Sequence, residues 1–173
     1  YQVFVSKNGY SSDRTFETGL PENPNPVKPH ATVAKDQLTQ ISFIIDKTSS
    51  LKIKSNDEFC RVHADWIFDI KGGKLIGTTP TVYKFSTTSA VDVNGEKLFS
   101  GLESDTYTFS TSYGATQAIA GTDISFPLVL NPDTFITANM LIATKTPNMT
   151  LIGVRDELGL AENEKVVLNP PAK

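Results

Sequence analysis

Apolar and polar side chains alternate most clearly between residues 60 and 70. The apolar members take every second position, and charged residues such as Arg61 and Asp69 stand between them. This period of two is typical of a β strand with one buried face. The sequence therefore predicts a half-buried strand whose core-facing residues are Cys60, Val62, Ala64, Trp66, Phe68 and Ile70.

Three short glycine-containing motifs predict tight turns between alternating segments. Gly72-Gly73 follows the strand above and is expected to close a β hairpin, because glycine accepts the positive φ angles of primed turns. Asn94-Gly95 is expected to close a second hairpin. Asn8-Gly9 follows a short N-terminal strand and closes either a hairpin or a loop, since the residues after it are polar.

Further short segments rich in threonine or alternating apolar residues bring the expected total to about eight to ten strands. Helical signals are weak, and at most two short helices are expected: a single turn at residues 131–133 and a segment of helix formers at 155–164. The additional strands are predicted at residues 38–46, 51–54, 81–86, 106–111, 124–130, 140–144, 151–154 and 165–168.

These elements predict an all-β fold. Many short strands joined by tight turns favour two antiparallel sheets packed face to face, as a jelly-roll or other Greek-key β-sandwich. A closed barrel would use the same alternating pattern and stays open as an alternative.

The length of 173 residues suits one domain, so we expect residues 1–173 to form a single β-sandwich domain. Four prolines between residues 21 and 29 exclude that segment from a central strand. Residues 1–30 are therefore expected to form an N-terminal strand and a proline-rich arm over the surface.

Composition narrows the classes of partner. Hydrophobic residues are 39% of the chain and charged residues 20%, with a formal net charge of -3, so no basic surface for direct nucleic acid binding is expected. The longest apolar runs, such as residues 126–130, are far below the roughly 20 residues of a spanning helix, and no membrane span is predicted. Cys60 is the single cysteine, which excludes a disulfide within the chain.

The sequence contains none of the common catalytic or cofactor-binding motifs. The chain has no Gly-x-Ser-x-Gly elbow, no Gly-x-Gly-x-x-Gly and no Walker pattern. Cys60 and His63 are three apart on the expected strand and would face opposite sides, so Cys60 is interpreted as a small core residue. His63, Asp65 and Asp69 would share one face, which suits either a cation or proton transfer, or a solvated or interface face.

The solvated or interface interpretation is preferred for that face. We accordingly predict that the protein is not an enzyme, that it has no catalytic, cofactor-binding or metal-binding residues, and that it binds no cofactor.

Aromatic residues leave a second possibility, carbohydrate binding. Tyr83, Tyr107, Tyr113 and Trp66 would stack on sugar rings if they reached the surface together, with the loops at 94–105 and 111–123 as the binding end. The alternation pattern places Trp66 in the core and argues against this arrangement. Asn148-Met149-Thr150 also matches the glycosylation acceptor pattern.

The function expected by elimination is that of a structural, self-assembling subunit: a capsid coat or decoration protein of a virion. A Ser- and Thr-rich surface of low charge, the proline-rich arm and the extended ends at 1–6 and 164–173 favour it. An extracellular pilus-like filament subunit and a carbohydrate-binding adhesin module are the alternatives. The expected partners are copies of itself and other coat or filament proteins, or a glycan under the last alternative, at a virion or extracellular surface.

Overall fold

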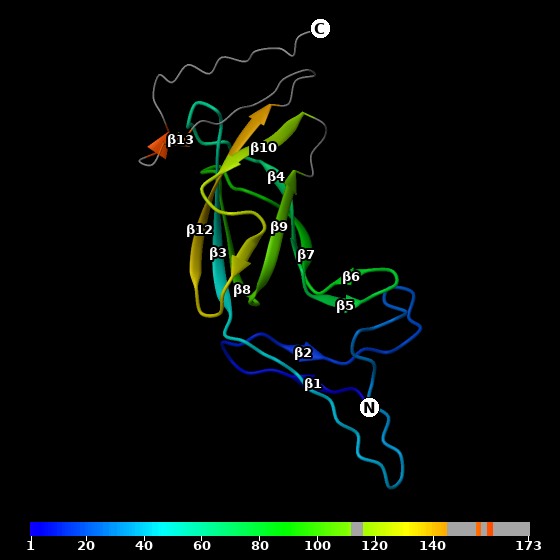
Figure 1. Cartoon of the computed structure of the whole chain (residues 1–173). Helices are drawn as coiled ribbons and strands as arrows, with labels where there is room; N and C mark the ends of the chain where they lie inside the picture. The colour runs from blue at the N-terminus through cyan, green and yellow to red at the C-terminus, as the bar shows by residue number, and fades with distance from the viewer. Residues whose placement is uncertain (112–115, 145–154, 157–158, 161–173) are drawn as a thin grey trace, which may run out of the picture.

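Two four-stranded sheets make up the main body of the computed structural model (Figure 1). The structure describes residues 1–111, 116–144, 155–156 and 159–160. One sheet has the order β10 (Gln117–Thr122), β12 (Phe135–Thr144), β3 (Ser49–Asn56), β8 (Glu96–Leu102). The other has the order β11 (Leu128–Leu130), β9 (Asp105–Thr111), β4 (Ile67–Gly72), β7 (Ser86–Ala90). We call these two sheets and their connections, residues 49–144, the sandwich.

The core lies between the sheets because each contributes an apolar face. Exposure alternates strictly along β3 and β4, so Leu51, Ile53, Phe68 and Ile70 are fully buried. Trp66 stacks on Phe68 with ring centroids 4.6 Å apart. The remaining core members come from β8, β9, β11 and β12 and from the residue that follows β7: Val91, Leu102, Tyr107, Leu128, Leu130, Ala138, Met140 and Ile142. The predicted all-β sandwich is confirmed, and its jelly-roll connectivity stays a prediction.

One pairing departs from the antiparallel expectation. β12 runs parallel to β3, with a register from Phe135 opposite Ser50 to Leu141 opposite Asn56. Both strands lie inside their sheet, although β3 lacks the near-continuous apolar sequence that is typical of parallel strands buried on both faces. The other strand pairs are antiparallel among the described residues.

The predicted strand at 60–70 begins later than its alternation suggests. β4 starts at Ile67, and Cys60 and Asp65 have positive φ angles of 59° and 57°, which no strand accommodates. The reason is a turn that begins at Asp57. Its carboxylate accepts hydrogen bonds from the backbone amides of Phe59 and Arg61, both at 2.9 Å. The second half of the predicted core set is correct, and Cys60, Val62 and Ala64 are exposed instead.

The Gly72-Gly73 hairpin is also wrong. β4 pairs with β7 and β9, whereas β5 (Leu75–Gly77) pairs with β6 (Val82–Tyr83). Neither glycine has a positive φ. Their role is close approach, because a Cβ at Gly72 would lie 2.5 Å from Oδ2 of Asp105.

The two Asn-Gly motifs do form turns. Gly95 has a φ of 69° and donates its amide to the Asp92 carbonyl at 2.9 Å, yet the turn joins β7 of one sheet to β8 of the other and closes no hairpin. Asn8-Gly9 lies between β1 (Phe4–Val5) and β2 (Asp13–Arg14), which pair antiparallel, so the hairpin alternative is confirmed there.

The remaining strand predictions have mixed outcomes. Those at 51–54, 106–111 and 140–144 fall within β3, β9 and β12. The segment 81–86 is a strand only over β6 and at Ser86, where β7 begins, and 124–130 only over β11. The segment 38–46 forms no strand. The predictions at 151–154 and 165–168 lie outside the described residues.

Neither predicted helix is found among the described residues. β13 (Arg155–Asp156) pairs with β14 (Gly159–Leu160), so both of these parts of the 155–164 segment are extended. Residues 157–158 and 161–164 lie outside the described residues. Residues 132–133 form a turn, in which Asp133 has a φ of 58°.

The N-terminal region, residues 1–48, lies at one end of the sandwich (Figure 1). After β1 and β2 the proline-rich segment runs along β5, where Val27 donates its amide to the Ile76 carbonyl at 2.9 Å and Pro26 forms a bridge with Gly77. As predicted, this segment forms no central strand. Residues 31–45 then run outward and back, and we call them the protruding loop (Figure 1).

Candidate functional site

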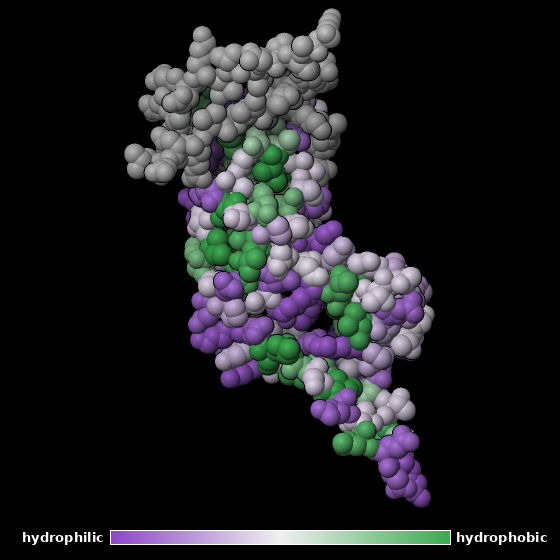
Figure 2. All heavy atoms as spheres, viewed as in Figure 1, coloured by the Kyte–Doolittle hydropathy of each residue, from purple (hydrophilic) through white to green (hydrophobic). Residues whose placement is uncertain are grey.

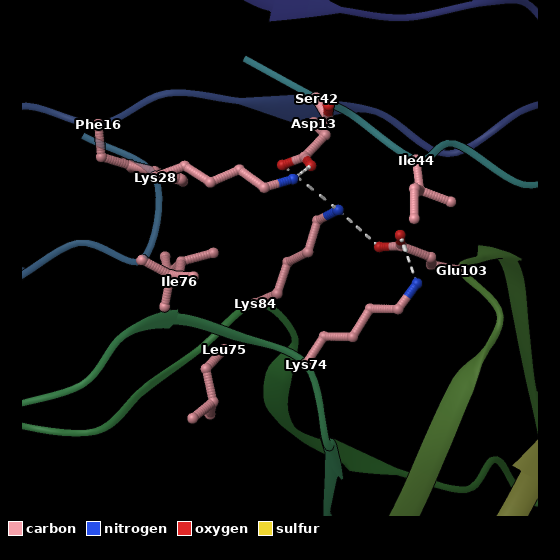
Figure 3. Close-up of a pocket in the computed structure, with 11 residues that line it drawn as sticks. Asp13, Phe16, Lys28, Ser42, Ile44, Lys74, Leu75, Ile76, Lys84 and Glu103 are labelled. Atoms are coloured by element: carbon pink, nitrogen blue, oxygen red, sulfur yellow. Dashed lines mark hydrogen bonds and ion pairs between the residues drawn. The ribbon is translucent and has the colours of Figure 1, made fainter. Parts of the chain in front are cut away.

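A pocket of about 470 Å³ lies where the N-terminal region meets the sandwich (Figure 3). Most of its accessible wall is apolar. Residues before the sandwich supply Phe16, Val27 and Ile44, and β5 supplies Leu75 and Ile76. This junction pocket therefore has walls from six separate stretches of chain, and Ile44 brings the returning leg of the protruding loop to it.

Five charged groups of the pocket form a chain of ion pairs. Glu103 binds Lys84 at 2.7 Å and Lys74 at 2.8 Å, while Lys84 also lies 3.9 Å from Asp13, which pairs with Lys28 (Figure 3). The side chains of Asp13 and Glu103 are only 11% and 14% exposed, so their charges are poorly screened. This chain of ion pairs connects the N-terminal region to the residue before β5, to the residue after β6 and to the turn between β8 and β9.

Asp13 is the electrostatic centre of this arrangement. Burial raises the pKa of its carboxyl, but hydrogen bonds from Lys28 and from the Arg14 amide, together with the charges of Lys84 and Lys28, outweigh burial and hold the pKa below its usual range. Asp13 is thus ionised at neutral pH. Because each of the five charged groups already has a partner of opposite sign, the site is suited to fastening two regions together.

A second set of contacts fastens the proline-rich segment. The Asn23 side-chain amide donates to the Ile76 carbonyl at 3.0 Å, and that of Asn25 donates to the Thr79 carbonyl at 2.7 Å. Asn23 fits closely here, since a Cβ at Gly77 would lie 2.1 Å from its Oδ1. These bonds and the ion pairs hold the base of the protruding loop against the sandwich.

The sequence candidates are not brought together. His63 lies in the loop before β4, with Nε2 at 3.0 Å from Nε2 of Gln117, while the Asp69 carboxylate accepts a hydrogen bond from the Thr88 hydroxyl. Asp65 stands at a positive φ outside the strand, so the shared strand face does not exist. Among the described residues no group of three or more His, Cys, Asp or Glu side chains is placed to hold a metal ion.

The aromatic candidates for sugar stacking are also dispersed. Trp66 and Tyr107 are each 1% exposed, and the Tyr107 hydroxyl donates to the Glu103 carbonyl at 2.8 Å. Tyr83 is half-buried beneath the Lys71 ammonium. Tyr113 and the acceptor pattern at Asn148 lie outside the described residues.

Sequence reasoning missed the junction pocket altogether. Its charged residues come from five separate places in the chain, from Asp13 to Glu103, and none forms a local motif. The available signal was the presence of Asn23 and Asn25 within the proline-rich segment, since asparagine side chains can donate hydrogen bonds to main-chain carbonyls.

Comparisons of this chain with protein-family models, with curated proteins and with solved structures found no match. No helix long and apolar enough to cross a membrane is present in the part of the chain that the structure describes.

Proposed function

We propose that this protein is a structural subunit that assembles with copies of itself, as a coat or decoration protein of a virion. The protruding loop is the observation that supports this most strongly. It extends outward from the N-terminal region and pairs with no strand among the described residues (Figure 1). Several of its apolar side chains are exposed to solvent.

The loop is unusually exposed for its composition. Leu38 is 93% exposed and Val33 is 62% exposed. Its two legs are joined by a hydrogen bond from the Thr39 hydroxyl to the Thr32 carbonyl rather than by a strand ladder. Apolar groups held in water are costly, and an exposed apolar segment on a folded protein is typical of an interaction site.

Both ends of the loop are fixed. At the outgoing end, the amino group of Tyr1 donates to the Ala31 carbonyl at 2.6 Å, and the His30 amide to the Phe16 carbonyl at 2.9 Å. At the returning end, the Ser11 amide donates to the Asp46 carbonyl at 2.8 Å. A loop on a fixed base loses less conformational entropy when it binds, which favours association.

Surface composition agrees with this role. Figure 2 shows hydrophobic patches on the visible faces of the sandwich and of the N-terminal region, separated by hydrophilic side chains. Exposed apolar residues on the sandwich include Val93, Leu98, Val129 and Phe135. A coat lattice and a pilus-like filament would both use such surfaces, and the shape of the assembly distinguishes them.

The test is the mass of the full chain in solution. Light scattering over a concentration series, with negative-stain electron microscopy, is expected to find closed particles, rings or lattices in the wild type. Val33→Ser combined with Leu38→Ser should shift assembly to higher concentration. Gln37→Ser, at an exposed polar side chain of the same loop, is the matched control. A strict monomer at every concentration contradicts the proposal, and filaments would favour the pilus-like alternative.

A further inference from the structure

β7 forms an open edge of the second sheet in the part of the chain that the structure describes. It pairs with β4 on one side and is the last strand in the sheet order β11, β9, β4, β7. In an antiparallel pair, alternate residues direct their N–H and C=O groups away from the neighbour, so β7 presents unpaired backbone groups along its outer side. Its sequence, Ser86 to Ala90, contains no charge and no proline, and four of its five residues are exposed.

The other sheet edges are better protected. β8 carries Glu96, which forms ion pairs with Lys52 at 2.5 Å and Lys54 at 2.9 Å. β10 has a register shift between Ile119 and Gly121, and β11 has three residues. Charges, bulges and shortness are the features by which natural sheets prevent pairing at an edge. β7 has none of them.

The protruding loop contains a segment suited to such an edge. Residues 38–43 have the apolar and β-branched composition of a strand and carry no charge, and the sequence alone predicts a strand there. Side-chain exposure alternates along residues 41–45, as in extended chain. No backbone hydrogen bond is formed by residues 40–45 with any other described segment.

We propose that residues 38–43 of one copy add as a fifth strand to the outer edge of β7 of a second copy. This inference rests on the proposed function and names the contact through which assembly takes place. Both partners are uncharged, so neither brings a desolvated ion to the interface. The donor and acceptor are different surfaces, which makes the contact head-to-tail, and repetition then closes a ring or extends a chain of subunits.

Cross-linking between two single-cysteine variants tests the contact directly. In a Cys60→Ser background, one protein carries Gln40→Cys in the loop and the other Thr88→Cys on β7, and the two are mixed and treated with a short bismaleimide. A cross-linked heterodimer is expected. Thr108→Cys is the matched control, because Thr108 is an exposed threonine of the same sheet on the interior strand β9.

A charge on the edge tests the same contact without cross-linker. Thr88→Lys is expected to raise the concentration needed for assembly at least about tenfold, whereas Thr108→Lys should leave it unchanged. Circular dichroism establishes that each variant is folded. If Thr88→Lys fails to fold, the cysteine pair decides by itself.

The outcomes separate the two proposals. Assembly with cross-linking at Thr88 and none at Thr108 supports the β7 contact. Assembly with equal cross-linking at both positions, or with none at either, overturns the β7 contact and leaves the structural role in place. A wild-type protein that stays monomeric overturns both.

Discussion

The sandwich and the N-terminal region are held together by different forces. Every fully buried apolar side chain among the described residues belongs to the sandwich, from Leu51 to Ala143. The buried residues of the N-terminal region are polar: Ser11, Thr15 and Asn23. Each of these three forms hydrogen bonds with the main chain. The sandwich thus has a core of its own, whereas the N-terminal region depends on directional contacts with the sandwich and with itself.

This difference explains why one region fixes the fold while the other is available for partners. Apolar burial contributes roughly 25 cal/mol per Å² and is cooperative over the whole core. Net contributions of single hydrogen bonds are about 1 kcal/mol each, and they are lost locally. We therefore expect changes in the sandwich to affect global stability and changes in the junction to affect the N-terminal region alone.

Phe68→Ala should have the largest effect. Phe68 is fully buried and stacked on Trp66, so its loss should lower the free energy of unfolding by about 3–5 kcal/mol. Phe4→Ala, at a side chain 60% exposed in the N-terminal region, should change it by less than about 0.5 kcal/mol. Urea unfolding followed by far-UV circular dichroism measures both. Similar losses for the two variants would contradict the proposed division between regions.

Gly77→Ala should have an intermediate and local effect. The added Cβ would lie 2.1 Å from Oδ1 of Asn23 and 3.1 Å from Cγ2 of Val82, a degree of overpacking that costs about 1–3 kcal/mol. Hydrogen exchange at the Val27 amide should accelerate, while exchange at Ile70 should not. Gly121→Ala is the control, because its nearest neighbour atom is 3.7 Å away. Equal acceleration at Ile70 would show that the regions unfold together.

Acid should produce the smallest effect. The pKa of Asp13 is lowered in the folded protein, so its ionised form stabilises the junction above the unfolded-state pKa of about 3.9, and this contribution is lost as pH falls through the lowered value. Below about pH 4 the N-terminal region should become more susceptible to brief proteolysis by pepsin while the sandwich stays resistant. Asp13→Asn should be more susceptible already at pH 5. If it responds to acid as the wild type does, Asp13 is not the relevant group.

The fold class could be predicted from the sequence because alternation reports burial locally. Phe68 and Ile70 were placed in the core from spacing alone, and the Asn8 and Asn94 turns from residue types that tolerate positive φ. The start of β4 could not be predicted in this way. A turn stabilised by the Asp57 carboxylate competes there with the strand, and alternation continues across the boundary.

The pairing of strands within each sheet and the residues of the junction pocket could not be predicted from the sequence for another reason. A turn motif shows where the chain reverses and leaves open which strand it meets next, so the Asn94-Gly95 turn crosses between sheets. The pocket joins Asp13 and Lys28 to Lys84 and Glu103, and these contacts exist only after the sheets have formed. The segment 38–46 has the composition of a strand but pairs with no other strand among the described residues.

The parallel pairing of β3 with β12 bears on how the molecule is made. The two strands are adjacent in the centre of one sheet, yet Leu51 meets Ile136, a residue from far along the chain. Contacts of such sequence separation are slow to form, because a long segment must be closed before they provide any stabilisation. During synthesis, β3 emerges from the ribosome well before β12, its parallel neighbour, has been synthesised. The nascent chain must therefore remain soluble with half of that sheet exposed, which makes this interval the stage at which it is most open to chaperones and to misassembly.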